Sequence, residues 1–382
     1  MKRLLIHALI FALPFVGILT VEIFFLPIDA FTFRHWEAME NDSSYRFFEG
    51  PFYPSVLLEG EEHGAEAYGT SLGGSRYTVA ETDRHGFRYS PSSFERFDVV
   101  IIGYSNIAGS YLDQSETLSR RLEERLVTGV YPFAPSGIKW FYRSERFRKS
   151  PPKVLLLAPI ERVIQEVKFD QEKWDPYERK LMTKFRARIR RIAAQRPWFR
   201  ELLVIGDRLK KQALYHYCLA ELSRSLERAI RTFYGVEERF RHPVAEDHSM
   251  MFLQGLEAVV PLDASEVERL LGDLRALQAY LRQCGTELLF MPIPNKETVY
   301  FDKVPGADPV SPTGLEDFLS EAREAGIPTI DLQSAYEDFR RRSDELLFFP
   351  DDSHWTPVAV EIAANLAHPV IEAVLSGASN AP

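Results

Sequence analysis

The chain has 382 residues, of which 45% are hydrophobic and 26% are charged. These values are typical of a globular protein that is long enough to bury a core, and they exclude wholesale disorder. The formal net charge of −9 argues against general nucleic-acid binding. With only two cysteines, Cys218 and Cys284, a disulfide framework and a cysteine-based metal site are also excluded.

The first 30 residues predict a membrane anchor. Two basic residues precede a nearly uninterrupted apolar run over residues 4–26, and no Ala-x-Ala cleavage site follows. About 20 apolar residues span a bilayer, whereas the apolar part of a cleavable signal peptide has about 7–15. We therefore expect residues 1–30 to be a single-pass transmembrane signal anchor in the cytoplasmic membrane, with the remainder periplasmic or extracellular. A long signal peptide cut near Ala30 is the alternative, and it would export the same domain.

Strands alternate with helices after an irregular lead-in, which we expect over residues 31–95. The continuous apolar run at residues 98–103 is typical of a strand buried on both faces of a parallel sheet. Further strands are expected within residues 129–137, 153–164, 286–294 and 327–332, and helices within residues 113–126, 264–285 and 357–375. This alternation predicts an α/β fold with a mostly parallel sheet and helices on both faces.

Residues 166–259 do not fit the alternation and are expected to be a basic helical insertion. Between residues 179 and 241 there are 17 lysines and arginines but only 6 aspartates and glutamates. The insertion is either a solvated cap or an electrostatic surface for an anionic polymer or for lipid headgroups. Arg186, Arg188, Arg190 and Arg191 would form such a surface. The catalytic domain is then expected over residues 96–165 and 260–378.

Ser105 is the candidate nucleophile. It lies two residues beyond the first buried strand, and ligands of open α/β sheets bind beyond the carboxyl ends of the strands. A serine hydroxyl needs a histidine to remove its proton, and the histidine needs a carboxylate to orient it. Of nine histidines, only His354 follows two carboxylates directly before the last helix, in the stretch DDSHWTP that begins at Asp351 and Asp352.

These stretches resemble the SGNH (GDSL-like) hydrolase superfamily, which implies a three-layer α/β fold. GYSN around Ser105 and DDSHWTP before the last helix carry the resemblance. DDSHWTP is similar to the Asp-x-His-Trp motif of the alginate O-acetyltransferase-like branch, and PIERVI and PIPNKETVY support the same branch. The resemblance covers roughly residues 80–165 and 280–375.

The chain departs from the superfamily pattern at two places. Tyr104 stands where the usual Gly-Asp-Ser has its aspartate, and Ile160-Glu161-Arg162 replaces the block that commonly lends an asparagine to the oxyanion hole. We therefore expect the oxyanion hole to consist of the N–H groups of Ser105 and Gly137. The superfamily spacing Asp-x-x-His selects Asp351 as the orienting acid, whereas the branch spacing Asp-x-His selects Asp352. Trp355 favours the second pattern.

Four further residues are candidate substrate-binding positions, namely Arg162, Asn295, Lys296 and Trp355. Trp355 is expected to form a lid over the triad, with stacking on a sugar ring as the alternative. No nucleotide or metal motif is present, so no cofactor is expected.

The resemblance implies a membrane-anchored, extracytoplasmic O-acyltransferase, O-acetyl in the leading case, that modifies a cell-surface or secreted polysaccharide. It also implies a polytopic membrane acyltransferase as the partner that supplies the acyl donor. Two alternatives remain open. One is a carbohydrate esterase of the same fold, and the other is a non-catalytic scaffold of an envelope polymer-export assembly.

Overall fold

The computed structural model describes most of the chain. The described residues are 2–21, 40, 48–68, 70–90, 94, 96–169, 188–189, 192, 195–211, 240–259, 262–307 and 314–377, with single or paired residues between 218 and 233. The strands are β1 Leu57–His63, β2 Ser75–Glu81, β3 Phe97–Gly103, β4 Gly129–Phe133, β5 Val154–Ala158 and β6 Glu287–Phe290. The longer helices are α1 Lys2–Thr20, α4 Leu118–Leu126, α9 Pro197–Lys211, α11 Ala264–Gln283, α13 Gly314–Glu324, α14 Leu332–Arg340 and α15 Pro357–Leu375. The short helices are α3 Ser105–Ala108, η3 Gln114–Glu116, α5 Ile138–Arg143, α6 Glu145–Lys149, η4 Glu161–Glu166, η5 Gly255–Val259, α12 Lys296–Val299 and η6 Phe301–Lys303.

Four strands form a parallel sheet in the order β4-β3-β5-β6. The ladder between β5 and β6 continues into the loops that follow them, where Ile160 pairs with Ile293. The segment expected as a further strand at residues 327–332 pairs with β6 only through one parallel bridge, between Phe290 and Thr329. The predicted α/β fold with a parallel sheet is confirmed.

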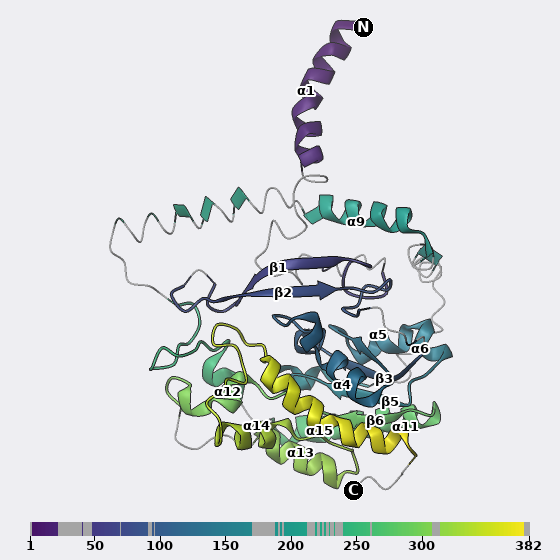
Figure 1. Ribbon diagram of the computed structural model, residues 1–382, viewed down its shortest axis with the longest axis vertical. Helices are drawn as coiled ribbons and strands as arrows, with labels where there is room; N and C mark the ends of the chain where they lie inside the picture. The colour runs from purple at the N-terminus through teal and green to yellow at the C-terminus, as the bar shows by residue number, and fades with distance from the viewer. Residues whose placement is uncertain are drawn as a thin grey trace.

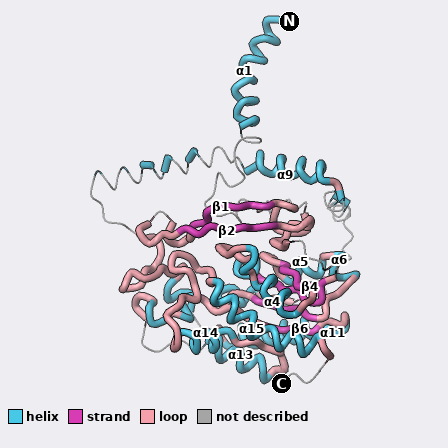
Figure 2. Tube along the Cα trace, viewed as in Figure 1, coloured by secondary structure: helices cyan, strands magenta, loops and turns pink. Residues whose placement is uncertain are grey.

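Helices cover both faces of the sheet, as Figures 1 and 2 show. Side chains of β3 alternate between two hydrophobic cores, because successive residues of a strand point to opposite faces. Val99 and Ile101 belong to the core that includes side chains of α4, α14 and α15. Val100 and Ile102 belong to the core that includes side chains of α5, α6, α11 and α13. The expected arrangement of three layers is therefore present.

The expectation that residues 31–95 are irregular is wrong for residues 57–63 and 75–81. β1 and β2 form a two-stranded antiparallel sheet in which Leu57 pairs with Glu81 and His63 with Ser75. The sequence pattern concealed these strands because β1 reads LLEGEEH, which is rich in glutamate and has low strand propensity. Figure 1 shows this hairpin between the catalytic sheet and the end of the molecule that carries α1.

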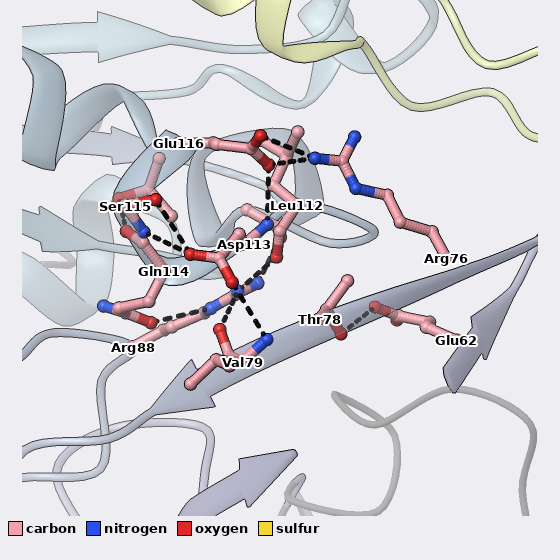
Figure 3. Close-up of polar contacts among 12 residues, drawn as sticks. Glu62, Arg76, Thr78, Val79, Arg88, Leu112, Asp113, Gln114, Ser115 and Glu116 are labelled. Carbon is pink, nitrogen blue, oxygen red and sulfur yellow. Dashed lines mark hydrogen bonds and ion pairs between the residues drawn. The ribbon is translucent and has the colours of Figure 1, made fainter. Parts of the chain in front are cut away.

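Polar contacts fasten the hairpin to the loop that follows α3, as Figure 3 shows. Arg88 is buried, and its guanidinium donates to the carbonyl oxygens of Val79 on β2 and of Gly109 and Leu112 in the loop. Arg76 on β2 forms an ion pair with Glu116. The hairpin therefore has a defined position relative to the chain segment that begins with Ser105.

One described helix, α15, is long and apolar enough to cross a membrane. Six of its residues are buried in the core, namely Ala359, Val360, Ala363, Ala364, Ala367 and Ile371, so α15 is a packed core helix. Near the N-terminus, a shorter apolar helical stretch is described over Ile10–Thr20, within α1. The N-terminal membrane span stays a prediction.

Much of the basic insertion lies outside the described residues, including Arg186, Arg190 and Arg191. Arg188 lies within a described helical pair of residues and is exposed. The longest described element of the insertion is α9. Its Phe199, Leu203 and Val204 pack against Phe48 and Tyr53.

Candidate active site

Ser105 is the first residue of α3 and lies directly beyond the carboxyl end of β3. The turn between them requires a glycine at position 103. A Cβ atom there would lie 2.5 Å from Cγ1 of Ile107 and 2.6 Å from the carbonyl oxygen of Ala158. Because Gly103 has no side chain, its backbone can pack closely against Ile107 and Ala158, and the helix can begin only two residues after the strand ends. Ser105 is half-buried at this edge of the sheet.

The structure brings Ser105 and His354 together, although 249 residues separate them. Nε2 of His354 lies 2.8 Å from Oγ of Ser105, which is a hydrogen-bonding distance. His354 is 7% exposed, so its ring is held within the protein. This geometry suits transfer of the serine proton to the imidazole.

Asp352, rather than Asp351, contacts His354. Oδ1 of Asp352 contacts Nδ1 of His354 and also accepts a hydrogen bond of 2.9 Å from the His354 backbone N–H. Oδ2 of Asp351 instead accepts hydrogen bonds from the Gly74 backbone N–H, at 2.8 Å, and from the Tyr111 hydroxyl, at 3.4 Å. Of the two spacings that the sequence left open, the geometry therefore matches Asp-x-His.

The turn between β1 and β2 clamps both carboxylates. The backbone N–H of Ala65 donates a 2.8 Å hydrogen bond to Oδ2 of Asp352, on the side opposite His354. Gly64 packs so closely that a Cβ atom there would lie 2.3 Å from Oδ2 of Asp351 and 2.5 Å from its carbonyl oxygen. The sequence pattern did not predict these contacts, and the glycines between the two strands are the local signal that could have indicated them.

Glu66, from the same turn, adds a buried carboxyl group to the site. It is 7% exposed and accepts a hydrogen bond from the Ser353 side chain, while its Oε2 has no hydrogen-bond partner among the described residues. Burial raises the pKa of Glu66 to about 7, and the nearby Asp352 carboxylate adds to this effect, whereas His354 and Lys296 oppose it. The site therefore favours the neutral, protonated form of Glu66 more than water does.

Lys296 supports the DDSH loop from the other side. Its ammonium group donates to the carbonyl oxygens of Phe349, Pro350 and Asp352 at 2.7, 3.0 and 3.2 Å. Lys296 is 1% exposed, and burial lowers its pKa to about 8. The expected contact of Lys296 with substrate does not fit this geometry, because all three of its donors are directed at the loop.

Asn295 is a structural link between the loops that follow β5 and β6. Its side-chain amide donates to the Ala258 carbonyl oxygen and accepts from the Arg162 backbone N–H, while its own N–H donates to Glu161. Because Asn295 is buried and so engaged, the expected substrate contact does not fit it either. Arg162 is half-buried, and its contact with substrate stays a prediction.

Trp355 is wholly buried in the hydrophobic core, so it neither forms a lid nor offers a face to a sugar ring. Its backbone N–H donates to Oδ1 of Asn106, the residue after the candidate nucleophile, at 3.4 Å. Its indole N–H has no hydrogen-bond partner among the described residues. Trp355 and Asn106 therefore link the two loops that carry His354 and Ser105. The sequence pattern could not show this, because a tryptophan after the histidine is compatible with burial or with exposure.

Gly137, the other expected oxyanion donor, lies at the same edge of the sheet. The neighbouring Ser136 donates its N–H to the Gly103 carbonyl oxygen at 2.9 Å, which brings the β4 loop beside the turn before Ser105. Gly137 is exposed, and open space surrounds the position of its missing Cβ. The placement is compatible with an oxyanion donor, and that role remains a prediction.

Comparison with known proteins supports the resemblance that the motifs carry. Residues 251–380 match the SGNH hydrolase-like domain of the acetyltransferase AlgX family. A segment of 96 residues is 31% identical to the probable alginate O-acetylase AlgJ of Pseudomonas putida. That alignment covers 24% of this chain and 24% of the relative, so the chain matches about a quarter of the relative's length.

Solved structures with limited overall similarity include two enzymes. A lipase/acylhydrolase from Enterococcus faecalis has 10% sequence identity and a TM-score of 0.35, with coverage of 72% of this chain and 95% of that one. The acetyl xylan esterase Est2A from Butyrivibrio proteoclasticus has 7% identity and a TM-score of 0.30, with coverage of 85% and 89%. These TM-scores are too low to support a functional comparison.

Proposed function

We propose that this chain, whose residues 251–380 match the SGNH hydrolase-like domain of the AlgX acetyltransferase family, is a serine O-acyltransferase that modifies a polysaccharide. The observation that carries the proposal is the linear contact from Ser105 through His354 to Asp352, built from segments 249 residues apart. Three such groups in this order are the arrangement that activates a serine hydroxyl. The retained contacts also disfavour a degenerate, non-catalytic scaffold.

In the first half-reaction, Oγ of Ser105 attacks the carbonyl carbon of an acyl donor. Nε2 of His354 accepts the hydroxyl proton, and the Asp352 carboxylate holds Nδ1–H and stabilises the imidazolium that forms. The N–H groups of Ser105 and Gly137 would stabilise the negative charge on the carbonyl oxygen. The bond to the leaving group then breaks, His354 returns its proton to that group, and an acyl ester on Ser105 remains.

In the second half-reaction, a sugar hydroxyl replaces the leaving group. His354 removes the hydroxyl proton, the sugar oxygen attacks the acyl ester, and the proton returns to Oγ of Ser105. Water in place of the sugar would give an esterase with the same residues. We favour an acetyl group and a polysaccharide acceptor, because the family match is to an acetyltransferase and the partial relative is a probable alginate O-acetylase.

We place the enzyme at the outer side of the cytoplasmic membrane, held there by α1 and supplied with acyl groups by a polytopic membrane acyltransferase. The support is that α1 exposes large apolar side chains between Ile6 and Leu19. A helix of this kind in water would expose apolar surface at a large free-energy cost.

The test is to incubate the purified full chain with an activated acetyl ester and a polysaccharide, and to measure both ester consumption and acetyl groups on the polymer. Transfer predicts polymer acetylation that increases with polymer concentration, whereas an esterase would release only acetate. Ser105→Ala and His354→Ala should each lower kcat by about 10⁴-fold or more, and the double variant should be scarcely worse than either.

Ser110→Ala is the matched control. Ser110 lies five residues after Ser105, and its buried hydroxyl has no hydrogen-bond partner among the described residues. Its removal should leave both reactions unchanged. Retention of full activity by Ser105→Ala would contradict the proposal.

A further inference from the structure

The helix α9 has a second apolar side that faces away from the protein. Trp198 and Leu202 lie four positions apart, so they are on one face of the helix. They are 65% and 59% exposed, respectively. When large apolar side chains are exposed together on one helix face, that face is typically an interaction surface for a membrane or another protein.

The side of α9 that adjoins this face is already occupied. Phe199, Leu203 and Val204 pack against Phe48 and Tyr53, which precede the β1–β2 hairpin. Trp198 and Leu202 therefore do not face the domain on which α9 rests. The helix therefore has two apolar faces. Among the described residues, the face with Phe199 and Leu203 packs against the protein, and the face with Trp198 and Leu202 is exposed.

The described residues of the insertion beyond α9 repeat this pattern. Leu219, Leu222 and Leu226 follow one another at spacings of three and four residues, as on one face of a helix. All three are exposed, and Phe233, seven residues further on, is 82% exposed. Exposed apolar faces thus recur within the segment that also carries the excess of basic residues.

The position of α9 favours a lipid bilayer as the partner of its exposed apolar face. Figure 1 shows α9 lying across the end of the molecule from which α1 extends, with α1 continuing along the long axis. If α1 crosses a bilayer, a helix that lies across its base runs parallel to the bilayer surface. Tryptophan is favoured at the membrane interface, and a basic segment is attracted to anionic lipid headgroups.

We propose that α9 lies in the interfacial layer of an anionic lipid bilayer, with Trp198 and Leu202 inserted among the acyl chains. This inference rests on the membrane attachment that is part of the proposed function. The bilayer would then hold the domain with its β1–β2 hairpin toward the membrane, since the hairpin lies between α9 and the catalytic sheet (Figure 1). The clamp on Asp352 and Asp351 belongs to that hairpin, so the active site would lie on the membrane-proximal side of the catalytic domain.

The experiment uses the full chain in nanodiscs that contain phosphatidylglycerol. The exposed cysteines Cys218 and Cys284 are replaced by serine. A fluorescent label is attached to one new cysteine at a time, in Phe11→Cys on α1, Leu202→Cys on α9 and Glu372→Cys on α15. Quenching is measured with a nitroxide on the lipid acyl chains and with iodide in water. Circular dichroism melts establish that each labelled chain is folded.

We expect strong quenching by lipid nitroxide and protection from iodide at positions 202 and 11. Position 372 should show the reverse, because it lies near the C-terminal end of α15, and α15 lies on the side of the β1–β2 hairpin that is away from α1 (Figure 1). Iodide quenching at position 202, with lipid quenching retained at position 11, would overturn the inference and leave the membrane attachment intact.

Two other outcomes would also overturn it. Protection of position 202 from both quenchers would mean that protein, either another segment of this chain or a second copy, covers α9. Iodide quenching at both positions 202 and 11 would remove the membrane attachment itself and, with it, the inference about α9.

Discussion

The backbone N–H of Ala65 donates a hydrogen bond of 2.8 Å to Oδ2 of Asp352. The other oxygen of this carboxylate contacts His354, so a residue in an N-terminal hairpin holds the acid of the candidate triad from behind. A hydrogen bond from a neutral donor to a carboxylate restricts its rotation as well as stabilising its charge. The hairpin is therefore expected to affect catalysis although it supplies no reacting atom.

The two adjacent aspartates should differ sharply in their contribution to catalysis. In Asp352→Asn the amide cannot both hold the Nδ1–H tautomer and stabilise imidazolium, so kcat for a small ester should fall by about 10⁴-fold. In Asp351→Asn the side-chain oxygen can still accept from Gly74 and Tyr111, so kcat should change by less than about tenfold. Steady-state kinetics of the two variants check this, and equal losses would contradict the assignment of Asp352.

Gly64→Ala should lower both stability and kcat. The added methyl group would overlap the Asp351 carboxylate and main chain, and overpacking of this kind typically costs about 1–3 kcal/mol. Because the displaced segment also carries Asp352, kcat should fall while KM for a small ester stays within about twofold.

Gly272→Ala is the control for this experiment. Gly272 lies within α11, and nothing lies within 4 Å of the position of its Cβ. Helix propensity favours alanine there by about 1 kcal/mol, so stability should rise and kcat should be unchanged. Chemical denaturation and ester kinetics measure both quantities. A Gly64→Ala variant as active and as stable as wild type would show that the clamp is dispensable.

Lys296→Met should separate a positioning role from substrate binding. Methionine fills a similar volume but donates no hydrogen bonds to the carbonyl oxygens of Phe349, Pro350 and Asp352. The carbonyl oxygens of Phe349 and Pro350 would keep the backbone N–H groups of Asp352 and Met251 as donors, whereas the Asp352 carbonyl oxygen would lose the lysine donor. A buried carbonyl group left without a partner costs about 1–3 kcal/mol. We expect a lower melting temperature and a reduced kcat with little change in KM. A raised KM with normal kcat would instead restore the substrate-binding role that sequence analysis assigned to Lys296.

Glu66 should make stability depend on pH in the neutral range. Its pKa is raised from 4.5 to about 7 in the folded chain, so the folded state binds a proton more tightly than the unfolded state. The stabilisation from this group is fully present below about pH 4.5 and is lost as pH rises through about 7.

A glutamine side chain does not titrate, so position 66 is neutral at every pH in the Glu66→Gln variant. As pH rises from about 5 to about 8, the unfolding free energy of the Glu66→Gln variant should therefore increase relative to that of the wild-type chain. Urea denaturation at each pH measures it. Parallel stability curves for the two chains would show that Glu66 does not titrate differently on folding.

The elements that the sequence predicted well are those with strong local patterns. The run that ends at Gly103 became β3, DLRALQAYLRQ became part of α11, and the segment after Thr356 became α15. The hairpin was missed because its strands carry as many charged as apolar residues. Arg88 joins β2 to the loop after α3, and no local sequence pattern encodes this contact.

For the candidate site, the sequence by itself determined the residue types and their order, namely a serine after a strand and two aspartates before a histidine. It could not determine which aspartate faces His354, because both spacings are compatible with the local chain. It also could not show that Lys296, Asn295 and Trp355 are buried, since burial depends on which segments pack together. Only the tertiary structure decided these points, because a hydrogen bond such as that from Ala65 to Asp352 joins residues 287 positions apart.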